Sequence, residues 1–274
     1  MKTTKIILIT GASSGIGKTT AKRLIQEGHV VYAAARRLDQ MEDLKEMGAV
    51  TIGMDITKTE DINRVVETIV KDYKRIDVLV NNAGYAIYGA VEETSMDDAR
   101  RQFDVNIFGL AELTKMVIPM MRNNNSGTII NISSMGGQMY TPLGSWYHAT
   151  KYALEGWSDC LRLELKQFGI NVVIVEPGVI ATEFGDVLMD PMMERSGNGP
   201  YAKIARALKK ATTDSYNEGG GSSPEVIARV IAKAVNSKKP KSRYVAGKLA
   251  KPMMMTRKWL GTGIFDKIIM SQVK

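Results

Sequence analysis

Short apolar runs alternate with longer amphipathic stretches along the first 180 residues of the chain. The runs are rich in Val and Ile and show no polar alternation, which is typical of strands buried on both faces of a sheet. They span Ile6–Thr10, Val30–Ala34, Val50–Met54, Val78–Asn81, Thr128–Ile132 and Val172–Val175. Repeated strand–helix units predict a parallel sheet with helices on both faces, because right-handed crossovers place the helices there.

Polar residues at the ends of the helical stretches predict where several helices begin and end. Thr57 and Glu60 have the spacing of a capping box, in which each side chain bonds the other residue's backbone N–H group. Ser95 precedes two aspartates and is expected to cap the next long helix. Another helix is expected over residues 145–168, with Gly169 as the residue that ends it.

The regular alternation weakens after Pro177. Residues 183–222 contain several glycines around a short helical pattern at Tyr201–Lys210. In an open α/β fold, a long connection here is expected to form a mobile lid over a ligand, and a disordered surface insertion is the alternative. Pro224, after a capping serine, predicts the first residue of a further helix, and a short strand is expected near Tyr244.

Length and composition are those of one ordinary globular domain. The 274 residues are 44% hydrophobic and 24% charged, and no internal repeat or long linker divides them. We therefore expect residues 1–274 to form a single α/β domain with a sheet of about seven strands.

Residue counts exclude several kinds of site. The single cysteine, Cys160, excludes an intramolecular disulfide and a cysteine-rich zinc site. The two histidines, His29 and His148, are far apart, so we expect no metal site. No run approaches the roughly 20 apolar residues of a membrane-spanning helix, and no targeting segment is visible, so we expect a cytoplasmic protein without integral membrane association.

The net charge of +8 comes from the C-terminal part of the chain, where 17 basic and 4 acidic residues follow Glu194. Nucleic acid, an anionic membrane or an acidic substrate would be attracted, and a solvated surface is the simpler alternative. No nucleic-acid-reading motif is present, so no nucleic-acid partner is expected. Residues 248–270 form a basic amphipathic segment that either rests on a membrane or covers its own pocket or a partner subunit.

A glycine-rich turn, Thr10–Gly17, separates the first strand from a helical pattern. Small residues let the backbone approach a pyrophosphate, and the helix N-terminus supplies N–H groups and the positive end of a dipole. The turn therefore predicts a dinucleotide site. Its expected contacts are Gly11, Ser13, Ser14, Gly15, Ile16 and Gly17.

The end of the second strand indicates which dinucleotide is bound. A site selective for NAD usually places an acid about 20 residues past the glycines, but this chain has Arg36 and Arg37. A guanidinium group suits the 2′-phosphate of NADP(H), and the alternative is that both arginines are solvated charges. Asp55 ends the third strand and is expected to accept from the adenine amino group, with Ile56 beside it.

Three residues have the chemistry for a hydride-transfer reaction. Tyr147 and Lys151 are four residues apart on an expected helix, so they share one face. A free tyrosine has a pKa of about 10, and a neighbouring ammonium lowers it toward the range useful for proton transfer. Ser134 follows a strand, and its hydroxyl is expected to bond a substrate carbonyl as negative charge develops on it.

The order and spacing of these motifs resemble the short-chain dehydrogenase/reductase family, of the single-domain type. The matches extend over residues 6–182 and comprise Thr10–Gly17, Asp55, Asn81–Gly84, Asn106, Ser134, Tyr147, Lys151, Pro177–Gly178 and Thr182. The resemblance implies a doubly wound Rossmann-type fold and transfer of a hydride to or from a nicotinamide, without a metal.

The resemblance also implies a role for each catalytic residue. Tyr147 would be the acid/base, Ser134 would orient the carbonyl, and Lys151 would bind the nicotinamide ribose and tune the tyrosine. Asn106 would hold a water that relays protons to the lysine. Tyr147 and Lys151 would also contact the cofactor, together with Asn82, Ala83, Gly84, Pro177, Gly178, Val179, Ile180 and Thr182. A homodimer or homotetramer is expected, as in related enzymes.

The substrate pocket is expected to be apolar. Its candidate residues are Ser134, Met135, Met139, Tyr140, Tyr147 and Phe184. Methionines are adaptable and favour a bulky apolar ketone or alcohol, although here they are equally explained as core filling. Steroid and retinol dehydrogenases of the family carry Ala-Arg-Arg at the same place, so the resemblance implies a steroid- or lipid-like substrate.

Three classes of function remain to be compared. The first is an NADP(H)-dependent oxidoreductase that interconverts alcohols and carbonyls, the second a non-catalytic NADP-binding sensor, and the third a nucleic-acid-binding protein. The set of Asn106, Ser134, Tyr147 and Lys151 favours the enzyme, because a sensor needs no proton donor.

Overall fold

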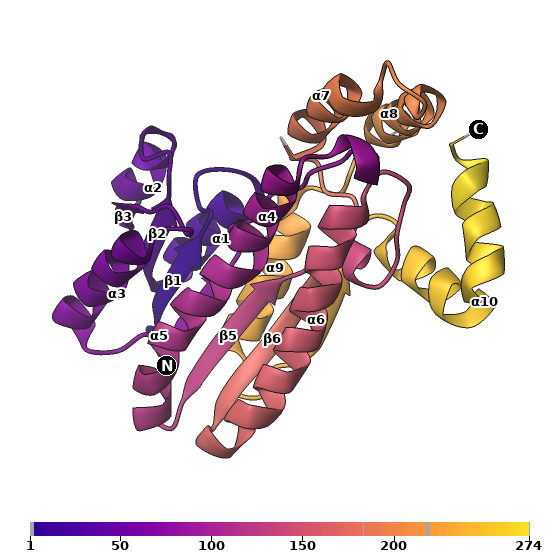
Figure 1. Cartoon of the computed structure of the whole chain (residues 1–274). Coiled ribbons are helices and arrows are strands. Elements are labelled where there is room, and N and C mark those ends of the chain that lie inside the picture. The colour runs from indigo at the N-terminus through magenta and orange to yellow at the C-terminus, as the bar shows by residue number, and fades with distance from the viewer. Residues whose placement is uncertain (1–2, 183, 218–219, 274) are drawn as a thin grey trace.

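Within residues 3–182, 184–217 and 220–273, which the computed structural model describes, seven strands form one parallel sheet in the order β3-β2-β1-β4-β5-β6-β7 (Figure 1). The strands are β1 Ile6–Thr10, β2 Val30–Ala35, β3 Val50–Gly53, β4 Val78–Asn81, β5 Gly127–Ile132, β6 Ile170–Pro177 and β7 Arg243–Ala246. The predicted parallel sheet is confirmed, including the strand near Tyr244. The order reverses direction between β1 and β4, which opens a crevice at the carboxyl ends of the strands.

Helices cover both faces of this sheet (Figure 1). They are α1 Gly15–Gln26, α2 Glu42–Glu46, α3 Thr59–Tyr73, α4 Met96–Phe103, α5 Leu110–Asn123, α6 Ser145–Leu165, α7 Phe184–Ser196, α8 Ala202–Asn217, α9 Pro224–Asn236 and α10 Ala250–Ser271. Ile7 and Ile9 of β1 share a core cluster with residues of α1, α2 and α9. Ile6 and Leu8 belong to a second cluster with α3, α5 and α6. Because each strand buries both faces, its sequence is continuously apolar.

The predicted helix ends are partly confirmed. The Ser95 hydroxyl accepts a hydrogen bond from the Asp98 N–H group at 3.1 Å, as expected for the cap of α4. The helix predicted over residues 145–168 is observed as α6 followed by a 3₁₀ turn, and Gly169 adopts a left-handed conformation with φ of 67°. The serine before Pro224 also caps its helix, accepting from the Glu225 N–H group at 3.3 Å.

The prediction of a capping box at Thr57 and Glu60 is wrong. Helix α3 begins at Thr59, and the residue at its cap position is Lys58. The Thr57 hydroxyl and N–H groups both donate to Asp55 Oδ1, at 2.8 and 3.0 Å. The Asp55 carboxylate is only two residues away, so it holds the threonine in a local turn before the helix starts.

Two segments extend beyond the sheet and its covering helices. Most of residues 183–222 forms α7 and α8 above the carboxyl ends of the strands (Figure 1). The short helix predicted at Tyr201–Lys210 is longer than expected, since α8 reaches Asn217. Helix α10 bends at Gly261, whose φ of 71° and ψ of 178° are not helical, and its second half runs toward α8 (Figure 1).

A cluster of charges joins α6 to the last two strands. The Arg243 guanidinium group pairs with Glu155, with Asp159 at 2.6 Å and with Glu176 at 3.1 Å. Glu155 and Glu176 are both buried. Burial and the neighbouring Glu155 charge raise the pKa of the Glu176 carboxyl to about 7. Arg243 therefore compensates two acids that would otherwise repel each other inside the fold.

We expect Arg243→Met to destabilise the protein by about 2–4 kcal/mol at pH 8, because it leaves buried carboxylates without their cation. A carboxyl with a raised pKa stabilises the fold when protonated, so the loss is expected to shrink at about pH 5.5. Urea unfolding followed by circular dichroism measures both values. Arg162→Met, which removes an exposed pair to Asp159, is the control and is expected to cost less than about 1 kcal/mol. Equal losses in the two variants would contradict the assignment.

Candidate active site

A cavity of about 1500 Å³ opens at the carboxyl ends of the strands and runs from the glycine-rich turn to helices α7, α8 and α10. It brings together nearly all the residues predicted to contact a cofactor. Those that line it are Gly11, Ser13, Ser14, Gly15, Ile16, Arg36, Arg37, Asp55, Ile56, Asn82, Ala83, Gly84, Tyr147, Lys151, Pro177, Gly178, Val179, Ile180 and Thr182. Gly17 is not among the lining residues of this cavity.

Gly17 is required by close packing beneath the turn. A Cβ atom at this position would lie 2.3 Å from the Gly11 carbonyl oxygen and 2.4 Å from Asn82 Nδ2. Gly11 itself has φ of 65°, a conformation that favours glycine. Asn82 Nδ2 donates to the carbonyl oxygens of Thr10 and Gly11, each at 3.0 Å. The asparagine therefore fixes the turn from the side of β4.

The N-terminus of α1 has the properties of an anion site. Its cap residue, Ser14, makes no side-chain capping bond in the described structure, and no acid lies in the first turn. The Ser14 hydroxyl instead accepts from Arg37 at 3.1 Å, and the Ser13 hydroxyl accepts from the same guanidinium group at 3.3 Å. N–H groups at a helix start and an adjacent arginine suit a pyrophosphate or a phosphate group. These residues fit a dinucleotide.

Arg36 also follows β2, and its charge acts on Asp55, whereas Arg37 bonds the glycine-rich turn. Burial alone would raise the pKa of the Asp55 carboxyl, but hydrogen bonds from Thr57 and the charge of Arg36 hold that pKa below its usual range. Asp55 is therefore ionised near neutral pH. One of its oxygens is already engaged by Thr57, so a contact with adenine would use the other oxygen.

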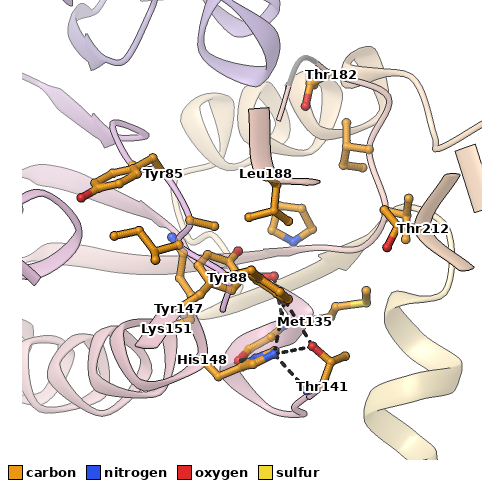
Figure 2. Close-up of a pocket in the computed structure, with 18 of the residues that line it drawn as sticks. Tyr85, Tyr88, Met135, Thr141, Tyr147, His148, Lys151, Thr182, Leu188 and Thr212 are labelled. Atoms are coloured by element: carbon orange, nitrogen blue, oxygen red, sulfur yellow. Dashed lines mark hydrogen bonds between the residues drawn. The ribbon is translucent and has the colours of Figure 1, made fainter. Parts of the chain in front are cut away.

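Lys151 is a buried cation beside Tyr147 on α6 (Figure 2). Its Nζ atom donates to the Ile132 carbonyl oxygen at 2.9 Å and lies 6.0 Å from the centroid of the Tyr147 ring. Burial lowers the pKa of the Lys151 ammonium to about 8, although the charge of Glu155 opposes the shift. The lysine is thus still mainly charged at pH 7, close to the phenol.

Asn106 lies on a π-helical turn, Asp104–Gly109, between α4 and α5. Its Nδ2 atom donates to the Tyr85 carbonyl oxygen at 2.9 Å and to the Thr150 hydroxyl at 3.1 Å, and its Oδ1 atom accepts from the Tyr85 N–H group at 3.1 Å. A Cβ atom on Gly84 would lie 3.2 Å from Asn106 Oδ1 and 3.9 Å from Lys151 Nζ. The amide is therefore buried behind the cavity wall, near the lysine.

His148 connects the loop after Ser134 to the helix that carries Tyr147. The Ser134 hydroxyl accepts from the Gly136 N–H group at 3.0 Å. His148 Nε2 accepts from the Thr141 N–H group at 3.0 Å (Figure 2). Nδ1 therefore carries the proton and donates to the Gly136 carbonyl oxygen at 2.9 Å. Burial lowers the pKa of the His148 imidazole, and the neutral ring holds the serine loop in place.

His148 and Tyr88 were not predicted from the sequence. The Tyr88 hydroxyl lies 3.3 Å from the Thr141 hydroxyl and 3.4 Å from His148 Nε2, and its ring is 6.1 Å from that of Tyr147. The position of His148 directly after Tyr147 was visible, but its partners come from distant segments.

No group of three or more potential metal ligands occurs within the described residues.

The predicted substrate residues separate into two groups. Ser134, Met135, Met139 and Tyr147 line the cavity. Tyr140, also expected there, is not among the residues that line this cavity. Its hydroxyl donates to Asp266 at 2.8 Å and its ring packs edge-on against Phe265, both on α10. The side chain of Phe184 lies outside the described part of the structure.

The far wall of the cavity comes largely from segments without a sequence motif. It is mainly apolar, and Arg195, Lys210 and Asp214 also line it. Its members include Tyr88, Leu188, Met189, Leu208, Met253, Ile268, Ile269 and Val273. Met189 lines the cavity, whereas Met192 is fully buried in the core between α7 and α8 and does not line it. Met189 belongs to the same core cluster, so one methionine can both fill the core and line the cavity.

Comparisons with known proteins agree with this geometry. The family model described as short chain dehydrogenase matches residues 5–191. A 3-ketodihydrosphingosine reductase from Bacteroides thetaiotaomicron is 38% identical, over 93% of each chain. A closed-form serine dehydrogenase complexed with NADP⁺ has a TM-score of 0.78 at 27% identity, covering 89% of this chain and 95% of that one.

A second similar structure is the 3-ketoacyl-(acyl-carrier-protein) reductase from Brucella melitensis complexed with NADH. Its TM-score is 0.76 at 26% identity, and the match covers 90% of this chain and 98% of that one. The segment that the family model matches, residues 5–191, contains the glycine-rich turn, the asparagine segment at the end of β4 and Ser134, Tyr147 and Lys151. This chain belongs to the short-chain dehydrogenase/reductase family, whose oxidoreductases act on CH–OH and C=O groups with a nicotinamide dinucleotide.

Proposed function

We propose that this enzyme uses NADP(H) to interconvert a ketone and a secondary alcohol, or an aldehyde and a primary alcohol, on a bulky, apolar, lipid-like molecule. The observation that carries the proposal is the continuity of one cavity. It joins the arginine-flanked glycine turn to Tyr147 and Lys151, and then to an apolar wall. The alternative of a non-catalytic sensor gives no reason for a buried ammonium beside a phenol.

The chemistry follows from the positions of three side chains. When the cofactor is bound, its nicotinamide ring supplies or accepts the hydride. Tyr147 donates a proton to the carbonyl oxygen during reduction and removes it from the alcohol during oxidation. Ser134 donates a hydrogen bond to the same oxygen while charge develops on it. Lys151 stabilises the phenolate form of Tyr147 because its buried ammonium is the adjacent positive charge.

Asn106 acts behind these residues. Its amide bonds both the N–H and the C=O group of Tyr85, which keeps the backbone after Gly84 close to Lys151. We assign Asn106 the role of keeping space beside Lys151 for a water molecule that relays protons to the lysine. This role accounts for a buried asparagine on a π-helical turn, a feature common at functional sites.

Arg36 and Arg37 support the choice of NADP(H). Both arginines line the cavity at the carboxyl end of β2, and no acid occupies that strand end. Arg37 is already oriented by Ser13 and Ser14 beside the first turn of α1. Arg36 is the group left to contact the 2′-phosphate, with Asp55 near the adenine.

The size and lining of the cavity support a long apolar substrate. The space beyond Tyr147 is bounded mainly by aliphatic and methionine side chains of α7, α8 and α10, with Tyr88 beside them. Burial of a hydrocarbon chain there is favourable by about 0.8 kcal/mol per methylene group. The relative named 3-ketodihydrosphingosine reductase acts on a ketone, and this chain is proposed to take a ketone of similar, lipid-like character.

Three further properties belong to the proposal. Helices α7 and α8 form a lid, because they cover the cavity and are joined to the sheet by glycine-containing connections. The enzyme works as a homodimer or homotetramer in the cytoplasm. Exposed Phe108, Tyr152 and Leu163, on α6 and on the turn before α5, provide an apolar surface for that assembly.

Tyr147→Phe removes the proposed proton donor and leaves the ring in place. We expect turnover to fall by about 10³-fold or more, while the Kd for NADPH changes less than about threefold. Nicotinamide absorbance with a panel of apolar ketones measures the rate, and fluorescence titration measures binding. Tyr88→Phe is the matched control, with a loss below about tenfold because its hydroxyl bonds Thr141 and His148. Full turnover in Tyr147→Phe would refute the assignment.

Lys151→Met is expected to abolish turnover but to stabilise the cofactor-free protein by about 1–3 kcal/mol at pH 7. A lysine whose pKa falls on folding costs stability while it is charged, so the gain is largest below pH 8 and shrinks as the pH rises further. Chemical denaturation at about pH 7 and about pH 9.5 tests this. The exposed-site control Lys71→Met should change stability by less than about 0.5 kcal/mol. A destabilised Lys151→Met would count against the buried charge.

Arg36→Ala is expected to raise the KM for NADPH by about 10–100-fold and to leave the KM for NADH within about threefold, since it removes a charge-assisted bond to the 2′-phosphate. Initial rates with each cofactor provide the comparison. Arg100→Ala, on the exposed side of α4, should leave both values unchanged. A similar loss for NADPH and NADH in Arg36→Ala would show that the arginine does not read the phosphate.

A further inference from the structure

The second half of α10 has an inner side that closes the substrate cavity. Phe265, Ile269 and Val273 follow one another at helical spacing, and all three are buried. Ile269 and Val273 line the cavity, and Phe265 packs with Met139 and Tyr140 next to it. One side of this half of α10 therefore faces the cavity, and the opposite side faces away from it.

The bend of α10 carries a group of exposed apolar side chains. We call Trp259–Ile264 the elbow; it includes the non-helical Gly261, and each of its residues is exposed. Trp259 is 73% exposed, Ile264 50% and Leu260 47%. Single exposed apolar residues are ordinary, but several around an exposed tryptophan mark an interaction surface. In Figure 1 the elbow projects away from the sheet and its helices.

The elbow is surrounded by positive charge. Lys258 Nζ lies 5.7 Å from the centroid of the Trp259 ring, and Lys251 and Lys267 are exposed on the same helix. Asp266 is the one acid in residues 248–274 of the sequence, and its carboxylate accepts a hydrogen bond from Tyr140. Tryptophan with aliphatic residues and flanking lysines is the combination that binds at the boundary between lipid headgroups and acyl chains.

We propose that the elbow is a docking surface for a lipid bilayer that bears anionic headgroups. Trp259, Leu260 and Ile264 enter the interfacial layer, and the flanking lysines contact the headgroups. Within the described residues no helix has the length and apolar content of a membrane span, so this contact is with the surface of the bilayer.

A second copy of the chain fits this surface less well. A two-fold contact between elbows would bring the lysines of one copy against the same lysines of the other. Lysine is also depleted in protein interfaces. An anionic bilayer accepts the apolar side chains and neutralises the cations at once. Docking of the outer side of α10 would bring the wall of the apolar cavity to the membrane, where lipid-like molecules are concentrated.

Vesicle sedimentation tests the docking with the full chain and no substrate, so the result does not depend on the proposed reaction. The vesicles are phosphatidylcholine alone, or equal parts phosphatidylcholine and phosphatidylglycerol. We expect binding to the mixed vesicles to exceed binding to phosphatidylcholine by about tenfold. The double variant Trp259→Ser with Leu260→Ser should lose about tenfold or more on both. The double variant Lys258→Glu with Lys267→Glu should lose the preference for the mixed vesicles.

Two controls match these changes at distant exposed positions. Val91→Ser, before α4, removes a valine that is 57% exposed, and Lys71→Glu on α3 reverses one surface charge. Both should bind vesicles like the unmodified protein. Turnover of a water-soluble ketone should be retained in the elbow variants, which separates failure of docking from failure of the enzyme. Absence of binding to either vesicle overturns the proposal. Unchanged vesicle binding by the Trp259→Ser, Leu260→Ser variant also overturns it. If neither protein binds vesicles and light scattering shows a lower particle mass for this variant than for the unmodified protein, the elbow is instead a contact between copies.

Discussion

The site depends on keeping one ammonium group inside the protein. Lys151 is buried, bonds the carbonyl oxygen at the end of β5 and lies beside the Tyr147 ring. A buried cation is unfavourable unless the surrounding structure compensates it, and here Glu155 follows one turn later on the same helix. That acid is in turn compensated by Arg243 on the last strand. The packing of α6 against β5, β6 and β7 thus places the acid and the arginine that compensate the buried charge of Lys151.

The same helix organises the remaining parts of the site through neutral hydrogen bonds. His148 bonds the backbone of the loop that follows Ser134 at two points, and Thr150 bonds Asn106 across the helix interface. The serine loop and the asparagine are therefore both held by the first turns of α6, through His148 and Thr150. In the proposed reaction, preorganisation of this kind lets the Ser134 hydroxyl act on a substrate oxygen without rearranging first.

The cavity combines two environments that the fold supplies by different means. Its dinucleotide side is built from the carboxyl ends of parallel strands, where glycines and helix N–H groups leave polar backbone accessible. Its proposed substrate side is built from α7, α8 and α10, which pack through methionine, leucine and aromatic side chains. Since only the second part lies outside the sheet framework, it can vary in shape while the reaction centre stays fixed.

The sequence by itself determined the parallel sheet, the glycine-rich turn, the arginines after β2 and the Ser134, Tyr147 and Lys151 triple. These are local patterns: buried strands are continuously apolar, and residues four apart on a helix share a face. Tertiary structure alone decided the contacts of Tyr140 with α10, the bonds of His148 and Tyr88, the Arg243 cluster and the α10 wall. Each of these joins residues far apart in the chain, and no local spacing encodes which distant acid, ring or carbonyl a side chain will meet.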